Sequence, residues 1–313
     1  MKFIDWFAGI GGFRRGMELC GHECVGFCEF DKYAVMSYTS MHLITDEQRE
    51  HLATLDIKAR QKEILKEEYR NGEWYANDVR TVDARSLPEA DCWCIGFPCQ
   101  DISVANRFGK GFSGNRSSLF FRIMYLLGQL PEESRPTWLF IENVKNLLSV
   151  NGGWDFARLL VELDRGGYDA EWQVLNSKNY GVPQNRERCF IVGYLRESGK
   201  RRVLPITGST DGVLKTVQCD TSGKGHKSQQ DRIYLPEGIM SCLPHARATT
   251  KCTTIVNGHP HILTARERMR LQGFAEEYID SAYFINEPNI IAAQAGNGVT
   301  VNVIKAIAER MEI

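Results

Sequence analysis

A cysteine and a glutamate each follow a short apolar run that could be a buried strand. Cys99 follows the run 92–97 through Pro98, and Glu142 follows the run 138–141. A thiolate is a nucleophile, although a cysteine in such a setting is more commonly an inert buried thiol. Because parallel strands bring their carboxyl ends to one edge of a sheet, we expect Cys99, Glu142 and the adjoining Asn143 to share a pocket.

Two arginines precede another apolar run, 190–194. They are Arg186 and Arg188, within the stretch Gln184–Arg188. A guanidinium beside a thiol lowers the thiol pKa and offsets negative charge that develops during a reaction. The ordered set of cysteine, glutamate and two arginines therefore predicts nucleophilic catalysis.

A glycine-rich turn, 8–12, follows the first apolar run, 2–7, and a second run, 24–28, ends at Glu29. Glycines let a ligand approach the backbone and a helix N-terminus, although such turns also serve helix–strand packing. Glu29 is placed to accept hydrogen bonds from a ribose diol. The spacing does not match GxGxxG, which disfavours NAD. Asp78 could accept from an adenine amino group, with Val79 against the ring, or could simply cap a turn.

Apolar runs alternate with helical patterns, for example at 119–130 and 156–163. This alternation predicts an α/β protein with a parallel sheet. Residues 46–70 hold seven acidic and six basic positions, which predicts a solvated amphipathic helix.

The composition changes between residues 195 and 262, where glycine, serine and threonine are frequent and the alternation of apolar runs with helical patterns stops. We therefore predict a catalytic and cofactor-binding domain at 1–194, a small irregular or β-rich domain at 195–262, and a C-terminal return to the first domain at 263–313. The middle stretch carries ten Lys and Arg against five Asp and Glu, so a whole-chain charge of -1 conceals a basic region. Such a region suits a phosphate-rich partner.

The 313 residues are 43% hydrophobic and 25% charged, which excludes disordered and fibrous proteins. No apolar stretch reaches the roughly 18 residues that span a bilayer, so no membrane partner is expected. Ten cysteines in a chain of this length do not form a disulfide scaffold, and their spacing completes no zinc set. A reduced intracellular protein without a metal is expected.

Taken together, these blocks resemble the DNA (cytosine-5)-methyltransferase family, in family order and across nearly the whole chain. Two departures are Trp6 and Gly298, where the family usually has Leu and Ser. The resemblance rests on Asp5–Gly12, Gly96–Gln100, Glu142–Val144, Gln184–Arg188, Leu263–Phe274 and Gln294–Val299.

The resemblance implies a Rossmann-like, S-adenosylmethionine-dependent methyltransferase fold, a mixed sheet with helices on both faces and a target recognition domain. S-adenosylmethionine would be the cofactor and S-adenosylhomocysteine its product. The cofactor-binding residues would be Phe7, Ala8, Gly9, Ile10, Gly12, Glu29, Phe30, Asp78, Val79, Gly96, Pro98, Leu119, Asn297 and Val299.

The chemistry that the resemblance implies is covalent. Cys99 would add to carbon 6 of a flipped-out cytosine so that carbon 5 can attack the methyl group. Glu142 would hold or protonate ring N3, Asn143 would position the strand and the exocyclic region, and Arg186 and Arg188 would stabilise charge. No residue stands out as the base that removes the carbon 5 proton, and water is a candidate.

Residues 103–118 have the glycines and basic side chains of a catalytic loop that closes over the flipped base. DNA contacts are expected from Ser103, Arg107, Lys110, Arg116, Arg232, Arg247, Lys251, Thr253 and Thr254. The same chemistry on transfer RNA, or an inactive DNA-binding member, are the alternatives. The resemblance further implies double-stranded DNA as partner, a monomer in a bacterial or phage-infected cytoplasm, and possible pairing with a separately acting restriction endonuclease.

Overall fold

The computed structural model describes residues 1–98, 119–199, 202–209, 216–217, 232–245 and 252–311, apart from the side chains of Glu197, Thr216 and Val217. Cys99 and the rest of the segment to residue 118 therefore lie outside the described residues.

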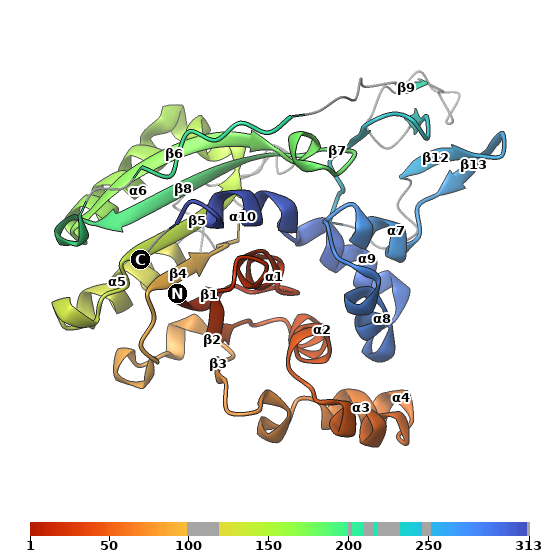
Figure 1. The fold of residues 1–313 in the computed structure, drawn as a ribbon, viewed down its shortest axis with the longest axis horizontal. Helices are drawn as coiled ribbons and strands as arrows, with labels where there is room; N and C mark the ends of the chain where they lie inside the picture. The colour runs from red at the N-terminus through yellow and green to blue at the C-terminus, as the bar shows by residue number, and fades with distance from the viewer. Residues whose placement is uncertain (99–118, 200–201, 210–215, 218–231, 246–251, 312–313) are drawn as a thin grey trace.

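A seven-stranded mixed sheet forms the centre of the molecule, in the order β3-β2-β1-β4-β5-β8-β6 (Figure 1). Strand β8 runs antiparallel to both of its neighbours, and the other pairs are parallel. The predicted α/β class with a mixed sheet is confirmed. The strands are β1 (Lys2–Trp6), β2 (Glu23–Cys28), β3 (Trp74–Ala76), β4 (Cys92–Ile95), β5 (Trp138–Val144), β6 (Tyr168–Asn176) and β8 (Glu187–Leu195).

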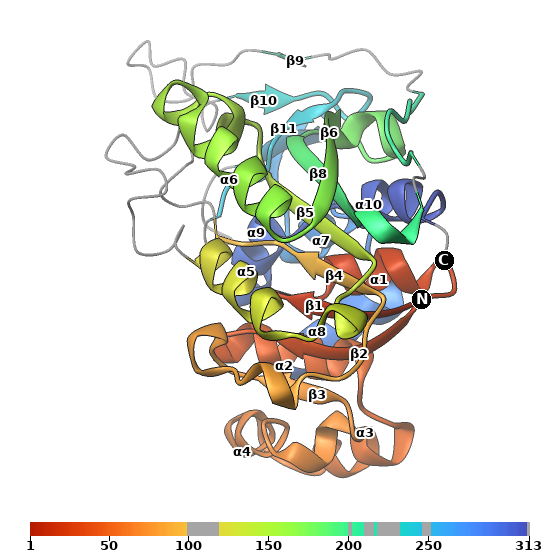
Figure 2. The same cartoon turned by 90° about the vertical axis from the view of Figure 1, so that its left-hand side faces the viewer.

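Helices cover both faces of this sheet because its central strands are apolar on both sides. Along β4, Cys92 and Cys94 pack into one core cluster, whereas Trp93 and Ile95 pack into the other, as the two-residue period of a strand requires. Helices α1 (Gly12–Glu18) and α10 (Val301–Ala308) bury one face, and α5 (Leu119–Gln129) and α6 (Trp154–Arg165) bury the opposite face (Figure 2).

Six further α-helices surround this centre. The predicted single helix at 46–70 is wrong: the structure has α3 and α4, followed by a 3₁₀ turn. The break occurs at Asp56, whose carboxylate accepts from the backbone N–H groups of Lys58 and Ala59 and so starts a new helix. The helices are α2 (Lys32–His42), α3 (Asp46–Ala53), α4 (Ile57–Glu63), α7 (Ala265–Arg270), α8 (Glu276–Ile285) and α9 (Pro288–Asn297); the 3₁₀ turns are Glu67–Arg70, Val79–Thr81, Ala84–Ser86, Glu132–Ser134, Lys145–Leu148, Val150–Gly153, Ser177–Tyr180 and Arg196–Ser198.

A second, smaller sheet has the order β13-β12-β10-β9. Its strands are β9 (Thr216–Val217), β10 (Ile233–Tyr234), β12 (Thr253–Val256) and β13 (His259–Ile262). Strand β11 (Met240–Ser241) instead pairs in parallel with β7 (Gln184–Asn185), which directly precedes β8. Strand β11, inside the stretch predicted as the recognition domain, is therefore hydrogen-bonded to the segment that leads into Arg186.

Residues 203–206, inside the predicted recognition domain, pack along the catalytic sheet. Glu171 of β6 accepts from the backbone N–H groups of Val203 and Leu204, and all but Pro205 of this short stretch are buried in the core. Residues 203–206 thus pack with the large sheet, and the chain leaves this sheet only after them.

One segment departs from the expectation that no apolar stretch is long enough to span a bilayer. Within the described residues, the C-terminal segment 288–308, which comprises α9 and α10, is long and apolar enough by length and composition. Its apolar window is 61% buried inside the protein. This burial is typical of core helices in a globular protein.

Candidate active site

The turn after β1 is bound to the end of β2 by Glu29. The Gly9 N–H donates to Glu29 Oε2 at 2.8 Å, and the Asp31 N–H donates to Glu29 Oε1 at 2.7 Å. Burial raises the pKa of the Glu29 carboxyl, although these backbone donors oppose the shift. Phe7 and Gly9 both have positive φ, at 58° and 56°, so the chain changes direction sharply directly after β1.

His42, which the sequence analysis did not single out, fixes the same turn from α2. Its Nε2 lies 3.0 Å from the carbonyl oxygen of Ile10. Burial lowers the pKa of His42 well below its ordinary value, so the ring is neutral and donates this hydrogen bond. No local motif marks this histidine, because its function depends on a contact across 32 positions in the chain.

The C-terminal motif Gln294–Val299 contacts the glycine-rich turn after β1 through Val299. A Cβ placed on Gly12 would lie 2.7 Å from both Val299 Cγ1 and the Val299 carbonyl oxygen. Glycine at position 12 is therefore needed for this close approach. Asn297 is exposed at the end of α9, two residues before Val299.

Phe30 and Asp78, two of the predicted cofactor contacts, both lie against the Arg80 side chain. The Phe30 side chain is 65% exposed, and its ring centroid is 5.9 Å from the Arg80 guanidinium. Asp78 accepts from Arg80 at 2.6 Å and caps the following turn, so Arg80 holds the Asp78 pKa below its usual value. Val79 is buried in the core rather than displayed to solvent.

Glu142, near the carboxyl end of β5, forms an ion pair with Arg188 of the neighbouring strand β8. Arg188 Nε lies 3.1 Å from Glu142 Oε1, and both side chains are less than one-fifth exposed. Burial raises the pKa of Glu142, whereas Arg188 and then Arg186 lower it, and burial dominates. A carboxyl in this setting can donate as well as accept a proton.

Asn143 holds the segment that leads into Cys99. It is 1% exposed, and its Nδ2 donates to the carbonyl oxygen of Phe97 at 3.1 Å. Gly96 and Pro98 lie within this segment, after β4, and Leu119 begins α5 on the far side of residues that are not described. The structure thus brings Glu142, Asn143 and the approach to Cys99 together, while Cys99 lies outside the described residues.

Arg186 lies beneath the ion pair and is 2% exposed. Its Nη2 donates to the carbonyl oxygens of Gly296 and Gly298, at 3.1 and 2.7 Å, and its Nη1 lies 3.2 Å from Cys242 Sγ. Arg186 therefore connects the residue between β7 and β8 to the last turn of α9 and to Gly298, which precedes Val299. Its described contacts are structural ones, in contrast to those of Arg188.

Three of the predicted DNA-contacting residues are described. Thr253 is buried in β12, the Thr254 hydroxyl donates to the Tyr234 carbonyl oxygen at 3.0 Å, and Arg232 precedes β10 with its Nε buried. DNA contact at these positions stays a prediction. The other six lie outside the described residues: Ser103, Arg107, Lys110, Arg116, Arg247 and Lys251.

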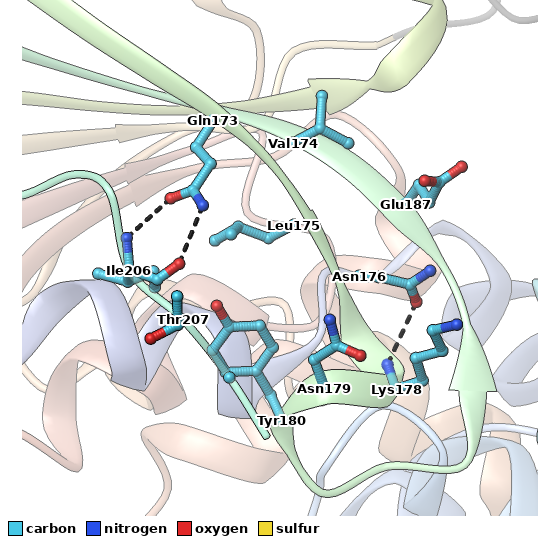
Figure 3. A pocket seen from close by; sticks show the side chains of 11 residues that line it. Gln173, Val174, Leu175, Asn176, Lys178, Asn179, Tyr180, Glu187, Ile206 and Thr207 are labelled. Carbon is cyan, nitrogen blue, oxygen red and sulfur yellow. Dashed lines mark hydrogen bonds between the residues drawn. The ribbon is translucent and has the colours of Figure 1, made fainter. Parts of the chain in front are cut away.

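A shallow cavity of about 360 Å³ lies at the end of β6, beside residues 206–208 (Figure 3). Its polar lining includes Asn176, Lys178, Asn179 and Glu187, and none of the predicted site residues lines it. Within the described part of the chain, no group of three or more His, Cys, Asp or Glu side chains could hold a metal ion.

An open α/β sheet, with a glycine turn after its first strand and a carboxylate ending its second, defines a protein that binds a nucleotide-like cofactor. The chain belongs to a family within this class, the C-5 cytosine-specific DNA methylases, whose profile matches residues 1–67, 41–230 and 214–312. The motif resemblance is thereby confirmed. The protein is an enzyme, a DNA (cytosine-5)-methyltransferase.

Relatives match almost from end to end. The chain is 30% identical to Type II methyltransferase M.HhaI of Haemophilus parahaemolyticus, over 98% of this chain and 93% of the relative. It is 31% identical to Type II methyltransferase M.HaeII of Haemophilus aegyptius, over 99% and 92%. Among solved structures, the Schizosaccharomyces pombe Dnmt2 methyltransferase shares the fold, with 16% identity, TM-score 0.65 and coverage of 98% and 96%.

Proposed function

We propose that this enzyme methylates carbon 5 of a cytosine extruded from a specific duplex DNA sequence, through a covalent bond between Cys99 and carbon 6. The observation that carries the proposal is the Glu142–Arg188 pair beside Asn143, which binds the carbonyl of Phe97 two residues before Cys99. This arrangement supplies a proton-sharing carboxyl and a cation beside the described segment that leads to the candidate nucleophile.

The residues around the β1 turn fit S-adenosylmethionine. A half-buried carboxylate, Glu29, suits a ribose diol, and the exposed ring of Phe30 offers an apolar face for adenine. Asp78 offers an acceptor for the adenine amino group. It lies near Phe30, because Arg80 pairs with Asp78 and also contacts the Phe30 ring. When bound, the cofactor supplies an electrophilic methyl group on a sulfonium.

In the first step that we propose, the Cys99 thiolate forms a bond to carbon 6 of cytosine. The electron pair of the carbon 5–carbon 6 double bond forms a carbon 4–carbon 5 double bond, the second pair of the carbon 4–N3 double bond moves onto N3, and N3 takes the proton from Glu142. The raised pKa of Glu142 supports this role because the proton remains available closer to neutral pH. Arg188 is placed to hold the same carboxyl in position.

The last step restores the ring. A base, for which we propose a water molecule, takes the proton from carbon 5, the carbon 5–carbon 6 double bond re-forms, and the carbon 6–sulfur bond breaks with its electron pair returning to Cys99. The Glu142 carboxylate takes back the proton from N3. The target base must first leave the duplex, at a cost of a few kcal/mol. The basic stretch 195–262 supports a phosphate-rich partner for this step, and DNA in the bacterial cytoplasm is the substrate that we infer.

Methyl transfer and adduct formation test the proposal separately. With labelled S-adenosylmethionine, duplex DNA should acquire label on cytosine, and a 5-fluorocytosine duplex should trap a covalent complex. Cys99→Ala should abolish both, whereas Cys20→Ala, a thiol outside the site, should keep both. Label that appears only on transfer RNA would contradict the DNA substrate, and activity in Cys99→Ala would contradict the covalent mechanism.

A further inference from the structure

Cys242 of the recognition region lies against the catalytic side chains. It directly follows β11, which pairs with β7, and the next residue, Leu243, donates its N–H to Gln184 Oε1 at 3.0 Å. The Met240 N–H also donates to the Pro183 carbonyl oxygen at 2.9 Å. The backbone on both sides of Cys242 is therefore fixed to the strand segment that carries the two site arginines.

The thiol lies within reach of two guanidiniums. Cys242 Sγ is 3.2 Å from Arg186 Nη1 and 3.7 Å from Arg188 Nη2. Arg188 in turn bonds Glu142 through its Nε, so Glu142, Arg188 and Cys242 form a continuous chain. Arg186 is 2% exposed, and within the described residues its Nε has no hydrogen-bond partner, so Cys242 faces a deeply buried cation.

The charged groups around Cys242 favour an anionic sulfur. Burial alone would raise the pKa of the thiol, but Arg186 and then Arg188 outweigh burial and lower it. Among the described residues, the other titratable groups of this cluster are Glu142, which lies beyond Arg188, and Cys252, whose own thiol pKa is raised by burial. The two guanidiniums that contact the sulfur stabilise its thiolate form.

We propose that Cys242 is a second reactive thiol of this site and a positioning residue that shares Arg188 with Glu142. This inference rests on the proposed function only for its positioning part. The reactive part concerns soft carbon electrophiles: the sulfur forms a bond to carbon, the carbon–halide bond breaks, and the halide leaves with the electron pair. The thiol proton goes to solvent beforehand.

Alkylation with iodoacetamide, read by peptide mapping of the folded full chain, tests the reactive part without any substrate. Cys20 is the matched control, because it is also partly exposed but burial raises its thiol pKa, and its sulfur faces the carbonyls of Gly16 and Lys305. Since the thiolate is the form that reacts, Cys242, whose pKa is lowered, should be alkylated faster at pH 7 than Cys20, whose pKa is raised. Equal or slower reaction of Cys242 would overturn the proposal.

The pH profile of single-turnover methyl transfer tests the positioning part. Without the thiolate, Arg188 has one anionic neighbour fewer and interacts more strongly with Glu142, so the limb of the pH profile that reports Glu142 should move to lower pH in both Cys242→Ala and Cys242→Ser. Cys252→Ser, a buried thiol of the same region, should keep the wild-type profile. A uniform loss of rate with an unmoved profile would show a merely structural role and refute positioning. Inactivity of the wild type on DNA would count against the proposed function and leave the alkylation result standing.

Discussion

Gly11 offers a direct test of how the cofactor loop is held. Its φ is +79°, and a Cβ at this position would lie 2.3 Å from His42 Nε2. His42 cannot swing aside freely, because it is partly buried and the Tyr38 and Tyr278 rings lie 5.0 and 5.3 Å away. Gly11→Ala should therefore force out the ring that bonds the Ile10 carbonyl.

Two contributions set the expected loss of stability. An alanine in the left-handed region costs roughly 1–2 kcal/mol. Displacing His42 leaves a buried donor and acceptor without partners, which costs about 1–3 kcal/mol more. We expect Gly11→Ala to lower the free energy of unfolding by about 3 kcal/mol, and to weaken S-adenosylmethionine binding because the loop carries its proposed contacts.

Gly21→Ala is the matched control, since Gly21 has the same φ of +79° and nothing within 4 Å of its Cβ position. It should lose only the backbone part, about 1 kcal/mol. Urea unfolding of both variants, and of Gly11→Ala in a His42→Ala background, separates the two contributions. If Gly11→Ala costs no more than Gly21→Ala, or if its cost is unchanged without His42, the steric argument is wrong.

Three further predictions concern single side chains. Asn143→Ala should cost about 1–3 kcal/mol in urea unfolding, because it strands the buried Phe97 carbonyl, and a neutral result would contradict the anchor. Since the Glu142 pKa is raised, the carboxyl loses its proton as pH rises through that value, and the rate of methyl transfer should fall on the alkaline side. Glu142→Gln should transfer methyl groups about 10²-fold more slowly, and its pH profile should lack this alkaline limb. Although burial of Glu267 opposes it, hydrogen bonds from His261 and Thr264 lower the Glu267 pKa. The stability that this carboxylate contributes is present above its unfolded pKa and lost as pH falls through the folded value, so wild type and Glu267→Gln should converge in acid denaturation; a constant gap would refute this.

Strand prediction succeeded where both faces of a strand are buried. Strands β2, β4, β5 and β8 each contain an apolar run, and β1 is apolar from Phe3 to Trp6 except for the buried Asp5. The two edge strands, β3 and β6, were not predicted. Strand β6 alternates polar residues such as Asp169, Glu171 and Gln173 with its apolar ones, because an edge strand buries less surface and bonds the passing segment 203–206 instead.

The sequence by itself determined the α/β class, the family and the order of the reactive blocks, since these depend on local runs and motifs. Only the tertiary structure decided which groups support them: His42 reaches Ile10 across 32 positions, and Cys242 reaches Arg186 across 56. It likewise showed that the nearest described contacts of Arg186 are backbone carbonyls, whereas those of Arg188 include Glu142. Residue type fixes what a side chain can donate or accept, but its partner, its burial and therefore its pKa depend on chain segments that only folding brings together.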